Sequence, residues 1–429
     1  MKQDIVYKYF FLLFSLIPIS ILFGSAVSAV NIMLISVSFF IYLIYLKEWN
    51  WLKNYQVQLL IIFYIYLIFN SFISIELENG LVRNFGFIRF IFFFVAFNYF
   101  FYKYKNFPKF LWVWFFVILI VVADVYLESI TGKNILGYGN GDRIVSFFKD
   151  EQIVGGFISC FYLIVIGYLL NFHKFKSIKL NYLFLFLAGI FLFSIILSGE
   201  RSSSIRAVAA FIFFFSFART FSIKEKIILF LSISILFVAI FANSEFVKLR
   251  YGKQLLRVMN LESFNQIIKY YTDDEAKFDD EFSMALGASY FRIYKSGIEV
   301  FKDYPLFGVG NKNYRIVTCP DTWPDEWNDD YLCTTHPHQI YIEFLSEHGI
   351  LGTTIILLIF SILIFKMLKQ TNIRENNLQL ACLLYIIFIF SPLIPSGSFF
   401  SNHPSTLFWV NFSLMFAANR RINIFNRSN

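Results

Sequence analysis

Two histidines flank a proline in the stretch TTHPHQIYIEFLSEHGILG, residues 334–352, just before a long apolar run. An imidazole group titrates near neutral pH, so it can accept a proton from a hydroxyl group. Pro337 suits the first turn of a helix, which predicts that His338 lies at the mouth of the helix that follows. On such a helix one face descends from His338 through Tyr341, Leu345, Gly349 and Gly352. The two glycines are expected to let another helix approach closely.

Arginines are expected near the same surface as the histidines. Arg201 lies in SGERSSS, residues 198–204, among glycine and serine residues whose N–H and O–H groups are free to bind an anion. Arg206 follows inside the next apolar run, where an ionisable residue predicts a function. A guanidinium group matches phosphate oxygens with a planar fork of donors. With a histidine nearby, these residues predict a site for a phosphate-containing lipid head group.

Three further arginines, Arg89, Arg143 and Arg292, are expected on or near this surface. Taken singly, each arginine is explained by snorkelling towards lipid head groups or by a surface ion pair. A single histidine at a membrane boundary is likewise explained by a structural role. The gathering of all these groups on one surface is what favours chemistry.

Four cysteines fall into two pairs. Cys160 and Cys382 lie inside apolar runs and are expected to be packing residues. Cys319 and Cys333 lie in a long polar segment and predict a disulfide just before the histidines. Zinc binding by these two cysteines with His336 and His338 is the alternative, but the compact spacings of zinc sites are absent.

Composition identifies the elements that must position these residues. Hydrophobic residues make up 58% of the 429-residue chain and charged residues only 15%, which is more apolar surface than a soluble fold can bury. Apolar runs of about 17–25 residues match the length of a transmembrane helix. We therefore predict an all-α polytopic membrane protein with twelve spans, at residues 8–24, 26–46, 56–76, 84–102, 110–129, 151–171, 180–198, 203–219, 225–243, 340–367, 376–394 and 404–419.

The first span also resembles a cleavable signal peptide, because basic residues precede it and GSAVSA, residues 24–29, follows it. We favour two uncleaved spans joined by a tight turn.

Basic residues orient these spans. Lys and Arg cluster in alternate connections and at the C-terminus, so the positive-inside rule places those connections and both termini in the cytoplasm. The net charge of +8 is spread over many short loops, which argues against a nucleic-acid partner. The basic connections are those around Lys47/Lys53, Lys103/Lys105/Lys109, Lys174/Lys176/Lys179, Arg219/Lys224/Lys226, Lys366/Lys369/Arg374 and Arg420/Arg421/Arg427.

The opposite, periplasmic side receives the polar segments that topology does not explain. They are residues 130–152, 197–204, 244–339 and 395–405. The third is too long for a simple connection and is expected to be functional. Within it, residues 287–310 read as a helix with a stripe of Phe291, Tyr294, Ile298 and Phe301, ended by Pro305, Gly308 and Gly310.

The chain thus divides into three regions. Residues 1–243 hold nine spans, residues 244–339 form a periplasmic loop domain with short helices, and residues 340–429 hold three spans and a cytoplasmic tail. The acidic segment 271–282 is expected to be a solvated part of the loop domain.

These motifs resemble those of the bacterial O-antigen ligases, a family that shares a superfamily with O-antigen polymerases and some protein O-oligosaccharyltransferases. The family pattern of His-[Asn/Ser/Gln], nine residues and Gly-x-x-Gly is met by His338, Gln339, Gly349 and Gly352. SGERSSS is similar to the family's Gly-x-Arg loop. GDRIVSFFKDEQIVGGFIS, residues 141–159, and FRIYKSGIEVFKDYPLFGVGNKNY, residues 291–314, resemble its segment entering the sixth span and its outer-loop helix.

The resemblance implies a glycosyltransferase of the inner membrane with a C-type membrane fold and an active site facing the periplasm. It would move a glycan from undecaprenyl diphosphate to a sugar hydroxyl of the lipid A core, with inversion and without a metal or other cofactor. Arg201 and Arg292 would hold the diphosphate, and His338 would assist the acceptor hydroxyl. Substrate contacts are expected from Arg206, Arg143, Arg89, His336 and Gln339, and structural roles from Gly349, Gly352, Cys319 and Cys333.

Other activities share these features. A polymerase that extends the glycan on its lipid carrier, or a transferase onto protein, would hold the diphosphate similarly. A transporter of lipid-linked sugars is the alternative from another class, but such proteins often show two similar halves, whereas here the polar residues gather on one face. Only the position of the motif selects His338 over His336 as the catalytic histidine.

Overall fold

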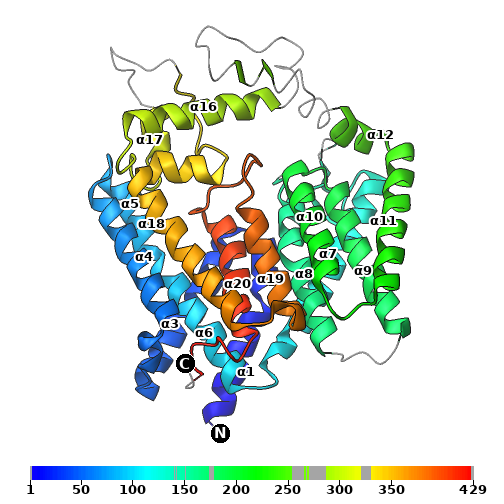
Figure 1. The fold of residues 1–429 in the computed structure, drawn as a ribbon, viewed down its shortest axis with the longest axis horizontal. Helices are drawn as coiled ribbons and strands as arrows, with labels where there is room; N and C mark the ends of the chain where they lie inside the picture. Colours follow the sequence, from blue (N-terminus) through cyan, green and yellow to red (C-terminus); the bar gives the residue numbers. More distant parts are fainter. Residues whose placement is uncertain are drawn as a thin grey trace.

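The structure is a computed structural model, which describes residues 2–139, 141, 143–149, 151–172, 178–253, 265–266, 268–269, 287–319 and 330–426. Within these ranges the regular structure is entirely helical. The helices form a bundle with both termini at one end and α16 (Gly287–Asp303) across the other (Figure 1).

Helices occupy all the apolar runs predicted to span the membrane. The first run is shared by α1 (Lys2–Ser15) and α2 (Ile17–Leu22), and the fourth lies over α5 (Leu77–Gly86) and α6 (Ile88–Lys103). The other runs form α3 (Ser25–Leu46), α4 (Tyr55–Phe72), α7 (Leu111–Thr131), α8 (Val154–Phe172), α9 (Ile178–Leu197), α10 (Arg201–Phe217), α11 (Ile223–Asn243), α18 (Ile340–Gln370), α19 (Asn377–Ile389) and α20 (Asn402–Ala417). Gly24, with φ of 114°, makes the tight turn between α2 and α3.

Seven helical segments of the described chain are long and apolar enough to cross a membrane. They are Ser25–Leu46, Tyr55–Phe72, Leu77–Lys103, Phe107–Thr131, Val154–Asn171, Ile223–Asn243 and Ile340–Gln370. Two shorter apolar helices, Asn181–Leu197 and Asn377–Ile389, accompany them. The structure therefore supports a multi-pass membrane protein, while the number of twelve spans stays a prediction.

Polar contacts distinguish the two ends of the bundle. At the end that holds the termini, Asn54 donates to the carbonyl of Ile424 (2.7 Å) and Asn376 to that of Ala418 (2.8 Å). Arg219 pairs with Glu375 at the same end (3.4 Å). These contacts join connections that the charge pattern assigns to one side. The histidines and Arg201 lie at the opposite end.

The segment between α11 and α18 contains short helices besides α16. Those with described bounds include α12 (Glu245–Val247), η4 (Lys248–Lys253) and α17 (Tyr314–Thr318). The predicted acidic segment 271–282 lies outside the described residues. α16 ends at Asp303, two residues before Pro305, as the proline predicts.

The predicted apolar stripe of α16 is only partly right. Tyr294 is buried, but Phe291, Ile298 and Phe301 are only half-buried. The buried face is centred instead on Gly297, where an added Cβ would collide with Ile342 of α18 and come within 3.1 Å of Pro337. The absence of a side chain at Gly297 lets the start of α18 pack against this face, an effect that a count of apolar residues does not reveal.

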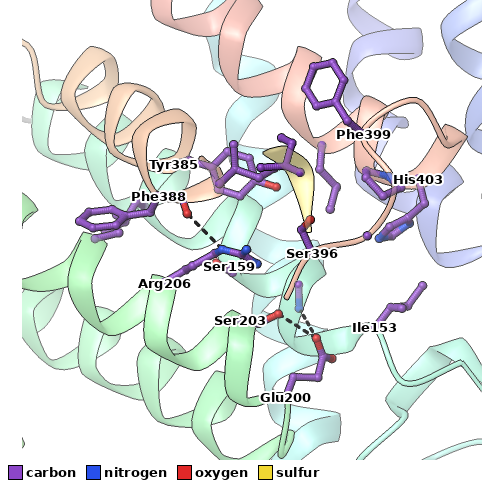
Figure 2. Close-up of a pocket in the computed structure, with 18 residues that line it drawn as sticks. Ile153, Ser159, Glu200, Ser203, Arg206, Tyr385, Phe388, Ser396, Phe399 and His403 are labelled. Atoms are coloured by element: carbon purple, nitrogen blue, oxygen red, sulfur yellow. Dashed lines mark hydrogen bonds between the residues drawn. The ribbon is translucent and has the colours of Figure 1, made fainter. Parts of the chain in front are cut away.

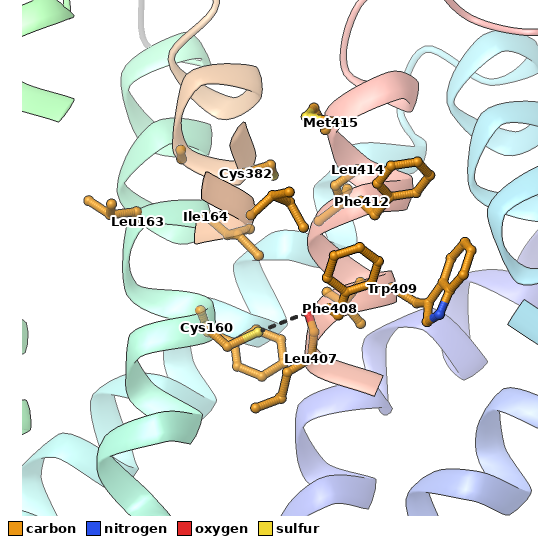
Figure 3. Close-up of a cluster of buried hydrophobic side chains, with 14 of the residues drawn as sticks. Cys160, Leu163, Ile164, Cys382, Leu407, Phe408, Trp409, Phe412, Leu414 and Met415 are labelled. Carbon is orange, nitrogen blue, oxygen red and sulfur yellow. Dashed lines mark hydrogen bonds between the residues drawn. The ribbon is translucent and has the colours of Figure 1, made fainter. Parts of the chain in front are cut away.

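Aromatic and aliphatic side chains fill the interior where α8, α19 and α20 meet (Figure 3). Cys160 and Cys382 are both buried there as free thiols. The Cys160 thiol lies 3.7 Å from the carbonyl oxygen of Leu407. Both cysteines are packing residues, as predicted.

Candidate active site

The arginine-bearing turn between α9 and α10 is fixed by a carboxylate. Glu200 accepts hydrogen bonds from the backbone N–H groups of Gly155 (2.6 Å) and Gly156 (3.0 Å), and from the Ser203 hydroxyl (2.9 Å; Figure 2). The two glycines belong to the first turn of α8, whose N–H groups have no partners within the helix. Glu200 therefore caps α8 and joins the motif segments 141–159 and 198–204.

Small residues allow this close approach. A Cβ on Gly155 would lie 2.5 Å from the Ser198 hydroxyl oxygen and 3.0 Å from the Glu200 carboxyl carbon. Gly199 has φ of 76°, a conformation that favours glycine, and its carbonyl accepts a hydrogen bond from Arg250 (2.9 Å). Burial raises the pKa of Glu200, while its backbone and hydroxyl donors oppose that rise. The turn is thus held from both sides.

Arg201 begins α10 directly after this turn. Its guanidinium group is half-buried and makes no hydrogen bond or ion pair within the described ranges. Arg143 lies close enough to Arg201 for their positive charges to interact, and its Cγ is 3.6 Å from the point where a Cβ on Gly199 would lie. Two guanidinium groups therefore stand at this turn.

Arg206 lies farther along α10 and points into a cavity of about 200 Å³ (Figure 2). Its guanidinium group donates to the carbonyls of Phe388 (3.1 Å) and Ile394 (3.0 Å) and pairs with no carboxylate of the described chain. The cavity lies among α8, α10, α19 and the connection to α20. Its polar lining consists of Ser159, Glu200, Ser203, Arg206, Tyr385, Ser396 and His403.

The histidines stand at the start of α18. The rings of His336 and His338 are 4.0 Å apart between centroids. His338 has φ of 53°, and its carbonyl oxygen accepts a hydrogen bond from the N–H of Ser396, a cavity residue (2.8 Å). This contact ties His338 to the cavity wall.

The helix begins where the span 340–367 was predicted to begin, but the predicted placement of Pro337 in its first turn is wrong. α18 begins at Ile340, and Gln339 caps it by accepting hydrogen bonds from the N–H groups of Tyr341 (2.8 Å) and Ile342 (2.9 Å). His338 therefore precedes the helix and does not continue its face, because a residue in the left-handed region cannot extend a right-handed helix. The side-chain oxygen of Gln339, which we expected to bind substrate, is used by the cap.

Both histidines are neutral at pH 7. Burial lowers the pKa of each imidazole to about 4. The Lys312 ammonium adds to the effect at His336, and His336 adds to it at His338. A neutral imidazole has a free lone pair, so His338 is able to accept a proton.

Tyr290 of α16 connects the two groups of residues. Its ring meets that of His338 edge-on, with centroids 5.9 Å apart, and it lies within electrostatic range of Arg201. The structure thus gathers Arg143, Arg201 and His338 around the first turn of α16. Arg206 and His336 adjoin this group.

Two predicted arginines do not join that group. Arg292 is exposed on α16, and residues two positions apart on a helix point about 200° apart, so it faces away from the direction of Tyr290. Arg89 donates to the carbonyl of Gly86 (2.9 Å) and to the Asn402 side chain (3.0 Å), and it does not line the cavity. Sequence position alone could not separate these residues from Arg201.

Sequence reasoning missed a buried charged network beneath the histidines. Glu343 accepts hydrogen bonds from the Ser398 hydroxyl (2.5 Å) and the Phe399 N–H (2.9 Å). The Lys312 ammonium donates to the hydroxyls of Ser398 and Ser401 (2.9 Å to the latter). An acidic residue in an apolar span was a usable signal for Glu343. Lys312, in a polar segment, carried none.

The signature glycines mark a crossing of two segments. Gly349 has φ of 62° and ψ of −172° and breaks α18. The N–H groups of Val309 and Gly310 donate to the carbonyls of Ser346 and Glu347 (2.9 Å each), while Ile350 and Leu351 donate to Pro305 and Leu306 (2.9 and 3.2 Å). The Pro-x-x-Gly-x-Gly segment 305–310 therefore fills the break in α18.

The partners of the two signature glycines differ. We expected a helix beside Gly349, but a Cβ there would collide with the backbone of Leu306 in that segment. At Gly352 the neighbour is a helix, because an added Cβ would overlap the Tyr66 hydroxyl of α4.

Cys319 and Cys333 are joined by a disulfide. Neither thiol is therefore available as a ligand, which removes the zinc alternative. No group of three His, Cys, Asp or Glu side chains suited to a metal ion occurs among the residues that the structure describes.

Fold and site together define a helical multi-pass membrane protein in which guanidinium groups and a neutral histidine pair gather at one end of the bundle. Residues 183–357 match the family model described as O-antigen ligase. The matched segment contains Arg201, Arg206, His338 and Gly349, so the resemblance drawn from the motifs is confirmed there. No curated protein matches the chain.

Proposed function

We propose that the protein is an O-antigen ligase, which transfers a glycan from undecaprenyl diphosphate to a sugar hydroxyl of the lipid A core. The main observation is that Arg201 and Arg206 lie at the same end of the bundle as neutral His338. Neither arginine has a carboxylate partner among the described residues. Cations without a carboxylate partner suit an anionic ligand, and a neutral imidazole suits a hydroxyl acceptor. The family match supports a glycosyltransferase.

The arginines would act on the leaving group. As the glycosidic bond to the diphosphate breaks, negative charge grows on the departing phosphate oxygen. Fixed guanidinium groups stabilise that charge without having to reorganise, which lowers the barrier. Arg201 and Arg143 would bind the diphosphate at the turn, and Arg206 would bind it at the cavity. Arg292 is the second clamp residue that the family resemblance implies.

His338 would act on the acceptor. Its neutral imidazole takes the proton of the sugar hydroxyl as the oxygen attacks the anomeric carbon from the face opposite the diphosphate, which inverts that centre. The negative donor nearby favours the protonated imidazole, so donor binding raises the pKa of His338 and strengthens it as a base. The proton then leaves to water.

The membrane orientation follows from charge. Basic connections lie at the end with the termini, so the positive-inside rule places that end in the cytoplasm. The candidate site would then face the periplasm of the inner membrane, beside the loop domain predicted for residues 244–339 and within a C-type membrane fold. Only 11% of the apolar window in α11 is buried within the protein, so membrane lipids would surround its exposed apolar side chains.

A transfer assay with purified protein tests the proposal. Protein in detergent receives an undecaprenyl-diphosphate-linked glycan, with or without lipid A core, and His338→Ala runs in parallel. Ligation predicts glycan on the core only when His338 is present. Longer glycans on the lipid carrier without core would identify a polymerase, and glycan on an added protein acceptor a protein transferase. The absence of any covalent product would point to a transporter.

A further inference from the structure

The connection between α19 and α20 contacts both an arginine and a histidine of the site. We call residues 394–402 the strap. At its start the carbonyl of Ile394 accepts a hydrogen bond from Arg206 (3.0 Å). Two residues later the N–H of Ser396 donates to the carbonyl of His338 (2.8 Å). The strap therefore bonds an arginine of α10 and the histidine before α18.

A buried serine holds the middle of the strap between opposite charges. The Ser398 hydroxyl donates to Glu343 (2.5 Å) and accepts from Lys312. Ser398 is 2% exposed and Glu343 is fully buried. The N–H of Phe399 bonds the second oxygen of Glu343 (2.9 Å). Because charged hydrogen bonds are strong in a low-dielectric interior, this network fixes the strap firmly.

The far end of the strap is also anchored. The side-chain oxygen of Asn402 accepts hydrogen bonds from Arg83 (2.9 Å) and Arg89 (3.0 Å). Between its anchors the strap lines the cavity through Ser396, Gly397 and Phe399. A segment held at both ends and in the middle, with its inner surface on the cavity, can set the spacing of the groups that it joins.

We propose that the strap positions the two halves of the site, and that Ser398, Glu343 and Lys312 are positioning residues that fix Arg206 relative to His338. The catalytic consequence of this inference rests on the proposed function, whereas the contacts of the strap do not depend on it. None of the three side chains is assigned a contact with the reacting atoms. Their loss should therefore reduce kcat more than it changes the KM for the donor.

The first experiment replaces Ser398 with alanine. The change removes the hydroxyl shared by Glu343 and Lys312 and leaves both charges without that partner. We expect hydrogen–deuterium exchange in peptides covering residues 394–402 to become about tenfold faster, because Ser396 and Phe399 lose the support of the network. In the transfer assay, kcat should fall about tenfold or more, with a much smaller change in the donor KM.

Ser194→Ala is the matched control. Ser194 is also buried, but its hydroxyl bonds the carbonyl of Phe191 within its own helix (2.7 Å). Neither exchange in the strap nor kcat should change in this variant. A similar response in both serine variants would mean that loss of any buried hydroxyl has the effect, and the strap would lose its assigned role.

The two measurements separate this inference from the proposed function. Faster exchange with unchanged kcat would show that the strap does not position the site, and unchanged exchange would show that Ser398 does not hold it. If the wild-type protein transfers no glycan, the proposed function fails. The exchange data then still show whether the network fixes the strap, but the positioning role falls with the proposed function.

A pair of charge variants gives an independent test. Lys312→Met leaves the Glu343 carboxylate as an uncompensated buried charge, and Glu343→Gln does the reverse. The double variant removes both charges and should recover at least threefold in kcat over the poorer single variant. Independent losses that multiply in the double variant would overturn the coupling through Ser398.

Discussion

The arginine side and the histidine side of the site are built differently. The arginine side consists of residues 198–206, which are the turn and the start of α10, together with Arg143. The histidine side consists of residues 336–349 with residues 305–312. On the first, Arg201 bonds no described residue and Arg206 bonds only carbonyl oxygens. On the second, Glu343 and Lys312 are joined through serine hydroxyls, and backbone hydrogen bonds lock α18 to its neighbour.

Because of this difference, we expect substrate binding to depend mainly on the arginine side and catalytic geometry on the histidine side. Positive groups without a carboxylate partner gain most from an incoming anion, so the arginine side should control how tightly the donor binds. Groups that are already fixed lose little freedom during the reaction, so the histidine side should control the rate of the bound complex. Variants on the two sides should therefore separate KM from kcat.

His338→Ala should have the largest effect. Loss of a general base costs about 10²–10⁴-fold in rate, and donor binding should be nearly unchanged because the imidazole is neutral. Initial rates at several donor concentrations measure both quantities. His336→Ala is the matched control on the neighbouring ring. A greater loss in His336→Ala than in His338→Ala would reverse the assignment of the two histidines.

Arg201→Ala should have the next largest effect, with about 10²–10³-fold lower kcat/KM and weaker binding of the glycan donor. The reason is that the change removes a guanidinium group that would donate hydrogen bonds to the leaving diphosphate. Arg201→Lys should recover only part of the loss, since the charge stays but the planar fork is lost. Membrane insertion should be intact in both variants.

Arg292→Ala tests whether α16 contributes a residue to the arginine side. The family resemblance implies a similarly severe loss, although the side chain is exposed on α16 in this structure. Transfer rates and donor binding for Arg201→Ala and Arg292→Ala, measured side by side, decide the composition of the clamp. Full activity in Arg201→Ala would remove the diphosphate role from the arginine side altogether.

Gly349→Ala should weaken the histidine side through its fold. The residue has φ of 62°, and an added Cβ would meet the backbone of Leu306, so the strain costs about 1–3 kcal/mol or more. A lower Tm in detergent measures the loss. Gly189→Ala is the control, because a Cβ at that helical position meets no atom within 4 Å. Equal Tm values for the two variants would contradict the crossing at Gly349.

The sequence allowed the elements of the site to be predicted better than the contacts between them. Each predicted apolar run contains helix in the structure, because the length and composition of a span depend on local sequence. The Cys319–Cys333 disulfide also follows from local position. By contrast, the start of α18 depended on a side-chain cap by Gln339, which outweighed the preference of Pro337 for a first helical turn.

Contacts between distant segments were out of reach for a physical reason. Lys312, Glu343 and Ser398 come from three separate segments, and only the packed fold places a serine hydroxyl between the two charges. The break at Gly349 is similar, since its backbone groups find their partners in residues 305–310. Periodicity describes one helix at a time and contains no record of such partners.

The pH dependence of the transfer rate should show that burial lowers the pKa of His338. The pKa of His338 is lowered from 6.5 to about 4, so the neutral base persists as pH falls through 6.5 and is protonated only near pH 4. We expect the acid limb of kcat/KM near pH 4 and that of kcat at higher pH, because bound diphosphate raises the pKa of His338.

Other titratable groups near His338 bear on this profile. They are His336, Glu343, Lys312 and Tyr290. Lys312→Met removes a positive charge that lowers the pKa of His336, so the pKa of His336 should rise in this variant. Recovery of activity after return to pH 7 excludes unfolding as the cause. A wild-type limb at 6.5 would show that burial does not govern the histidine.

The smallest expected effect is that of a chelator. If guanidinium groups stabilise the departing diphosphate, the arginine side needs no divalent cation, and EDTA should leave the initial rate unchanged. The comparison between the two sides makes the test stricter, because a metal ion bound with the donor would act where Arg201 acts. A contradicting result would be a loss of activity in EDTA that a divalent cation reverses and that does not occur in an EDTA–Mg²⁺ control. In that case a metal ion, not arginine, would stabilise the leaving group. The histidine side would keep its assignment in that case, since accepting the hydroxyl proton requires only a neutral imidazole.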